Sequence, residues 1–166
     1  YVSIMLFDGY HIQFDRRSDD GFPLTGTNNI NGVNDGGGTT SHDLSTIPAS
    51  VLAVEDDYVR KVIDTVNDLP NVLYEISNES GSYSTTWQQH MITLIKSYET
   101  NMPLQHPVGF TFQYAGGTDA TLYGSSADWI SPGERFPTNN GTRHVLNNDT
   151  DHSYFWTAMK SEGAQL

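Results

Sequence analysis

Apolar runs that stop at polar residues alternate with helix-like patterns along this chain. The runs predict strands at residues 1–7, 72–77, 108–112, 127–131 and 143–148. A helix is predicted at residues 54–69, where Val59, Val62, Ile63 and Val66 share one face. A second is predicted at 85–99, with the buried stripe Trp87, Met91, Leu94, Ile95 and Tyr98. Strands that alternate with helices indicate an α/β domain with a parallel sheet.

The segments around these helices carry further expectations. Residues 8–53 have no helical period and are rich in Gly, Asn, Asp and Ser, so they are predicted to form a long loop. This loop is either part of an active face or a plain surface excursion. Glu55, Asp56 and Asp57 are placed in the first turn of the first helix, where the helix dipole favours acids. Thr85 and Gln88 fit a capping box at the start of the second.

The length, net charge and cysteine count of the chain exclude several kinds of fold and partner. The chain has 166 residues, whereas a complete (β/α)8 barrel takes about 250, so a barrel here is a partial one. It opens without Met, which indicates an interior fragment, a processed product or an incomplete sequence. A net charge of -12 opposes nucleic acid and anionic membranes as partners. The 0 cysteines remove disulfides and thiolate chemistry but do not fix the compartment. A secreted or periplasmic location is the expectation.

Polar side chains collect where the predicted strands end. The second strand runs into Asn78 and Glu79, the first into Asp8, and the third into Gln113. In barrels the chemistry sits at the carboxyl ends of the strands. Carboxylates and amides among flat rings suit a carbohydrate, because rings stack on sugar faces while polar groups bind the hydroxyls. The remaining members of this candidate site are Tyr114, Trp129, Asn148, Asp149, Asp151, His152 and Trp156.

Glycoside hydrolysis requires two carboxyl groups. Glu79 is the candidate general acid/base, against the alternative of a solvated loop residue. Asp149 or Asp151 is the candidate second carboxylate, against an Asx-rich turn that satisfies its own backbone. A metal site remains as another reading, in which Asp8, His11, Asp151 and His152 hold an ion in a barrel hydrolase.

The segment 71–80, Asn-Val-Leu-Tyr-Glu-Ile-Ser-Asn-Glu-Ser, resembles the fourth barrel strand of clan A glycoside hydrolases. The acid/base Glu of that clan follows an Asn, which matches Asn78 and Glu79. The wider chain resembles a group of poorly characterised bacterial barrel proteins of this type. The resemblance rests on 2–7, 28–33, 58–64, 106–113, 127–132 and 148–152.

This resemblance implies that the five strands are the third to seventh of eight. The clan's nucleophile is a Glu that ends the seventh strand, where this chain offers only Asp149 and Asp151. The expected function is a glycoside hydrolase that cleaves a polysaccharide or oligosaccharide by a two-carboxylate acid/base mechanism and needs no cofactor. The alternatives are a non-catalytic carbohydrate-binding or structural barrel remnant, and a metal-dependent barrel hydrolase. An incomplete barrel would expose sheet edges and favour a homo-oligomer.

Overall fold

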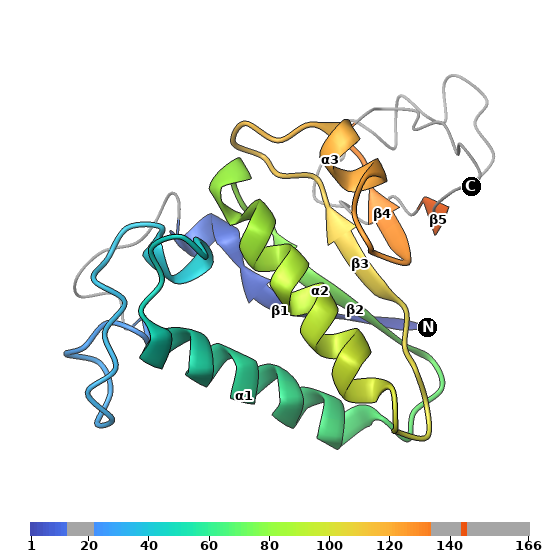
Figure 1. Ribbon diagram of the computed structural model, residues 1–166, viewed down its shortest axis with the longest axis horizontal. Helices are drawn as coiled ribbons and strands as arrows, with labels where there is room; N and C mark the ends of the chain where they lie inside the picture. The colour runs from blue at the N-terminus through green and yellow to red at the C-terminus, as the bar shows by residue number, and fades with distance from the viewer. Residues whose placement is uncertain (13–21, 134–143, 146–166) are drawn as a thin grey trace.

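The computed structural model describes residues 1–12, 22–133 and 144–145 of the chain. Its centre is a sheet of five parallel strands in the order β1-β2-β3-β4-β5, so each strand pairs with the next one in sequence (Figure 1). The strands are β1 (Val2–Asp8), β2 (Val72–Asn78), β3 (Val108–Thr111), β4 (Trp129–Ser131) and β5 (His144–Val145). The predicted parallel sheet is thereby confirmed.

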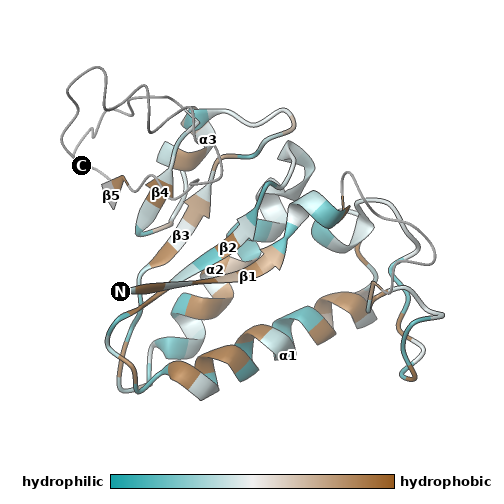
Figure 2. Cartoon of the chain, turned by 180° about the vertical axis from the view of Figure 1, so that it is seen from behind, coloured by the Kyte–Doolittle hydropathy of each residue, from teal (hydrophilic) through white to brown (hydrophobic). Residues whose placement is uncertain are grey.

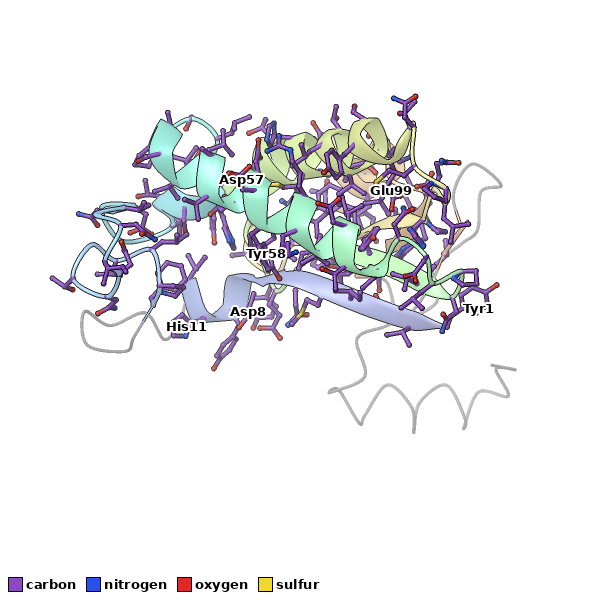
Figure 3. All side chains as sticks on the ribbon, turned by 90° about the horizontal axis from the view of Figure 1, so that it is seen from below. Tyr1, Asp8, His11, Asp57, Tyr58 and Glu99 are labelled. Carbon is purple, nitrogen blue, oxygen red and sulfur yellow. The ribbon has the colours of Figure 1, made fainter. Side chains whose placement is uncertain are left out.

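Helices connect the strands. They are α1 (Ala49–Val66), α2 (Thr85–Glu99), a short α3 (Asp119–Tyr123), and the 3-10 turns η2 (Thr40–His42) and η3 (Ser82–Ser84). Figure 3 shows α1 and α2 on the same side of β1. Consecutive parallel strands with the main helices on one face are compatible with a section of a barrel. The described residues do not close one, so the barrel stays a prediction.

The core lies between the sheet and the two long helices. Tyr74 of β2 points to this side, because its hydroxyl donates to Glu99 Oε1 at the end of α2, at 3.3 Å. Side chains alternate along a strand, so the even-numbered residues of β2 share this face. Figure 2 shows hydrophobic patches separated by polar ones along α1, as expected for a helix with one buried face. The fully buried residues of this core include Ile63, Tyr74, Ile76, Trp87, Met91, Ile92, Ile95, Val108, Phe110 and Ile130.

The opposite face of the sheet carries a continuous row of paired residues. Met5 pairs with Glu75, Glu75 with Gly109, and Gly109 with Trp129. A Cβ built on Gly109 would lie 2.0 Å from ring atoms of Trp129, so the indole lies directly over this glycine. Trp129 is only 2% exposed. The absence of a side chain at position 109 therefore makes room for the tryptophan.

Replacing Gly109 by Ala is expected to lower the free energy of unfolding by about 1–3 kcal/mol, because the new methyl group overpacks against the indole of Trp129. Urea denaturation of the variant measures the loss. A Trp129→Ala background serves as the control, because it removes the clash. An equal loss in both backgrounds would mean that the indole does not set the cost.

The structure corrects two expectations about helix starts. α1 begins at Ala49, five residues before the predicted start, so Glu55 lies well inside the helix rather than in its first turn. The expected capping box at Thr85 and Gln88 is wrong. The N-cap of α2 is Ser84, which makes no side-chain capping bond, and Thr85 Oγ1 instead donates to Gln113 Oε1 at 3.0 Å. The bounds of α2 match the prediction.

β1 forms one edge of the sheet within the described residues. Two of its apolar side chains remain largely outside the core, with Val2 54% and Met5 48% exposed. A strand edge of this kind presents unpaired backbone groups and apolar surface that can bind further strands. No helix in the described ranges is both long enough and apolar enough to span a bilayer.

Candidate functional site

The carboxyl ends of β1 and β2 bring three of the predicted site residues together. Asp8, the last residue of β1, pairs in register with Asn78, the last residue of β2, and Glu79 follows directly. Asp8 is exposed, while Asn78 and Glu79 are half-buried. Asp8 Oδ1 also accepts a hydrogen bond from the backbone of Tyr10, at 3.0 Å. Two acids and an amide thus lie along the same edge of the sheet.

Glu79 has a backbone conformation that non-glycine residues rarely adopt. Its φ is 46°, and within the described part of the chain every other residue with positive φ is a glycine. A residue in this left-handed region costs about 1–3 kcal/mol and persists only where its surroundings enforce it. Such residues concentrate at active sites and ligand contacts. The strained position coincides with the residue that the sequence singled out as the acid.

Tight packing on both sides of Glu79 enforces this backbone. A Cβ built on Gly9 would lie 2.4 Å from Ser80 Oγ and 2.5 Å from Ser80 Cα, so the turns after β1 and β2 are in direct contact. The hydroxyls of Ser77 and Ser80 lie 2.6 Å apart and are hydrogen bonded. On the other side, Gly81 forms a parallel bridge with Ala115. The residues before and after Glu79 are therefore fixed.

Gln113 contributes to this fixation rather than to an open binding surface. It is 1% exposed, and its Oε1 accepts from Thr85 Oγ1. Its Nε2 donates to the carbonyl of Gly81 at 3.1 Å and to Ser84 Oγ at 3.2 Å. Both polar atoms of the Gln113 amide are therefore hydrogen bonded to groups within the protein. This geometry argues against the predicted contact with substrate and makes Gln113 a residue that positions the turn after Glu79.

The two described aromatic candidates differ in accessibility. Tyr114 follows β3, next to Ala115, and is 61% exposed, so its ring can stack on a ligand. Trp129 opens β4 instead of ending it and is buried over Gly109. Within the described residues, its Nε1 has no hydrogen-bond partner. Burial argues against Trp129 as a sugar platform, whereas Tyr114 keeps that role as a prediction.

The remaining predicted site residues lie outside the described ranges. They are Asn148, Asp149, Asp151, His152 and Trp156. The expected pairing of Glu79 with a second carboxylate therefore stays a prediction. Within the described residues, no group of three or more His, Asp or Glu side chains has a metal-binding arrangement. The metal site expected at Asp8, His11, Asp151 and His152 is half outside those residues and also stays a prediction.

Comparison with known proteins gives no family for this chain. No protein family, curated protein or solved structure matches it. The likeness of residues 71–80 to clan A glycoside hydrolases therefore rests on the sequence pattern alone. What the geometry adds is the strained backbone at Glu79 and its place beside Asp8 and Asn78.

The sequence analysis did not predict a buried cluster that is formed by His42, Glu55 and Trp87. Glu55 and His42 are each 2% exposed, and both contact Trp87. Glu55 Oε2 accepts a hydrogen bond from Trp87 Nε1 at 2.8 Å. The His42 ring stacks on the indole, with the two ring centroids 4.0 Å apart. The sequence did contain a signal for this burial, because Glu55 lies at a spacing of four residues from its apolar neighbours in the series Val51, Glu55, Val59 and Ile63. This series indicates that Glu55 shares the buried face of the helix.

Burial raises the pKa of Glu55 to about 8, and the nearby charges of Asp56 and Asp35 act in the same direction, while the bond from Trp87 opposes them. The folded protein therefore holds this proton more tightly than the unfolded chain does. The contribution of this proton to the free energy of unfolding is fully present below the ordinary pKa of a glutamate and is lost as pH rises towards 8.

Relative to a Glu55→Gln variant, the wild type is expected to lose about 1.4 kcal/mol of unfolding free energy for each pH unit in this window. Gln keeps an acceptor for Trp87 and does not titrate. Urea denaturation of both proteins between pH 5 and pH 8 measures the difference. Asp57→Asn, at a position with an 80% exposed side chain, is the control and should leave the pH profile unchanged. Parallel profiles for wild type and Glu55→Gln would contradict the assignment.

Proposed function

We propose that this chain belongs to a (β/α) barrel glycoside hydrolase and carries its acid/base residue, Glu79. The observation that carries the proposal is the left-handed backbone of Glu79 at the carboxyl end of a buried parallel strand, enforced by packing on both sides. The sequential order of the parallel strands, with α1 and α2 on one face, supports the barrel part of the proposal. The resemblance of residues 71–80 to the fourth strand of clan A enzymes points the same way.

In this mechanism Glu79 donates its proton to the glycosidic oxygen as the bond between that oxygen and the anomeric carbon breaks. Asn78 binds a sugar hydroxyl beside it, and Asp8 contributes a further acceptor at the same edge of the sheet. Tyr114 provides an exposed ring for stacking. The reaction uses carboxyl groups and water and needs no cofactor.

Asp149 or Asp151 supplies the second carboxylate in this proposal. If it lies about 5 Å from the Glu79 carboxyl, it attacks the anomeric carbon and the reaction retains configuration. If the separation is about 6.5–9.5 Å, it activates a water molecule and the reaction inverts configuration. Proton NMR of the first product formed from a glycoside of known anomeric configuration distinguishes these outcomes.

The test is an assay of the purified chain against a panel of aryl glycosides and plant and microbial polysaccharides. Multiple turnovers that release reducing sugar support the proposal. Polysaccharide binding without cleavage would instead favour a non-catalytic carbohydrate-binding domain. Loss of activity on treatment with a chelator, restored by a divalent ion, would favour a metal-dependent hydrolase. Neither binding nor cleavage across the panel would contradict all three.

A further inference from the structure

A cavity lies at the edge of the sheet, and Glu79 is not among its lining residues. It has a volume of about 470 Å³, is partly open to solvent, and is lined by residues 6–8, 11–12 and 22–24, by His42, and by Val54, Glu55 and Tyr58 of α1. This volume falls within the range of small-molecule sites. Most of the lining side chains are apolar or aromatic, among them Phe7, Phe22, Val54 and Tyr58. Figure 3 labels Tyr58 on α1, and Asp8 and His11 at the end of β1.

Glu55 gives this cavity a specific polar group. It lines the cavity and is 2% exposed. One carboxyl oxygen accepts from Trp87, whereas the other, Oε1, is buried and has no hydrogen-bond partner within the described residues. A buried carboxyl oxygen without a hydrogen-bond partner costs free energy, which a bound ligand that hydrogen bonds to it would recover.

The electrostatic surroundings of Glu55 favour a cationic donor over a neutral one. Asp56 and Asp35 both act on Glu55 as negative charges and oppose its ionisation. The other titratable groups that line the cavity are Asp8, His11, His42 and Tyr58. Tyr58 donates its hydroxyl to the carbonyl of Leu6 at 3.1 Å. A ligand with a positive charge would relieve the repulsion among the acids and allow Glu55 to ionise.

Aromatic rings on the cavity wall add to this preference. Phe7 makes edge contacts with Tyr58 and with His42, each with ring centroids 5.5 Å apart. Rings of this kind attract cations through their faces and accept apolar groups equally well. The wall therefore fits a molecule that combines an apolar body with one positive charge.

We propose that this cavity binds a small organic amine, with its apolar body against the aromatic wall and its ammonium group hydrogen bonded to Glu55 Oε1. The site is separate from the proposed hydrolytic centre, and among the residues that the structure describes the two share only Asp8. It requires no contribution from Glu79.

The probes are tryptamine and tryptophol, which share an indole-ethyl body and differ in the terminal ammonium or hydroxyl group. Isothermal titration calorimetry of the full chain at pH 7.5 is expected to give a Kd for tryptamine at least about tenfold lower than for tryptophol. Glu55→Gln is expected to remove this difference by weakening tryptamine binding alone. The variant should fold, because Gln resembles the protonated glutamate.

Val54→Trp tests the location of the site. Val54 lines the cavity, so a larger side chain at this position would fill it. Because Val54 is 41% exposed, the helix can carry the larger side chain without a clash in the core. This variant should weaken both probes at least about tenfold with an unchanged circular dichroism spectrum. The proposal is overturned if tryptamine does not bind, if both probes bind the wild type equally, or if either variant binds tryptamine as the wild type does.

Discussion

Replacement of Glu79 by Gln is expected to lower kcat/KM for glycosides with poor leaving groups by about 10²–10⁴-fold, the usual contribution of a positioned general acid. Gln has nearly the same size and can still form hydrogen bonds, but it has no proton to give to the departing oxygen. Substrates whose leaving group departs without protonation, such as 2,4-dinitrophenyl glycosides, should lose far less. Initial rates for a series of aryl glycosides with different leaving-group pKa values measure this effect.

The dependence on the leaving group separates catalysis from folding. A misfolded variant would lose activity on every substrate by the same factor, whereas a missing acid penalises only the poor leaving groups. Asp57→Asn is a matched control, because it also exchanges a carboxylate for an amide, at an exposed position on α1. It should leave all rates unchanged. A uniform loss for Glu79→Gln, or none at all, would remove Glu79 from the acid role.

Replacement of His106 by Ala is expected to destabilise the protein by about 2–5 kcal/mol, because it removes hydrogen bonds to Glu99 and to the carbonyl of Leu69, and each buried group left unsatisfied costs about 1–3 kcal/mol. His106 is 6% exposed and Glu99 is 1% exposed. The His106 Nδ1 atom lies 2.7 Å from Glu99 Oε1, and its Nε2 lies 2.9 Å from the carbonyl of Leu69. Asn67 also donates to Glu99 Oε1, at 3.0 Å.

This cluster joins the end of α1, the end of α2 and the start of β3, so its loss should lower the urea midpoint without changing the slope of the transition. His106→Asn is the informative control, because its amide nitrogen can take the place of Nδ1 and retain the bond to Glu99. It should cost clearly less than His106→Ala. A loss below about 1 kcal/mol for the alanine variant would show that Glu99 finds other partners when the ring is absent.

The elements that the sequence predicted best are those with a strong local pattern. α2 has a long apolar stripe, and the helix predicted from it has the same bounds as the observed one, Thr85–Glu99. β2 reads as one continuous apolar run, as expected for a strand covered on both faces, and its end at Asn78 correctly marked a polar edge of the sheet. The position of Glu79 after that strand followed from the same pattern.

Long-range contacts explain what the sequence did not predict. Gln113 was expected to face a ligand, yet its partners Gly81, Ser84 and Thr85 come from the preceding loop and helix, and no local signal reveals them. Glu99 and His106 lie seven positions apart, but the contact depends on how the chain turns between α2 and β3. Glu55 was misplaced because helix boundaries are set by a few residues, here around Pro48.

The Glu99–His106 cluster and the strand ends at Asp8 and Glu79 lie at opposite ends of the sheet, as the positions of Glu99 and Asp8 in Figure 3 illustrate. Substitutions more than about 7–10 Å apart with no shared partners usually have additive effects. Substitutions at Tyr10 or Tyr114 are therefore expected to leave the hydrogen bonds of the Glu99–His106 cluster intact. If Glu79 acts as we propose, residues around it can be varied to change substrate preference while the Glu99–His106 cluster continues to stabilise the fold.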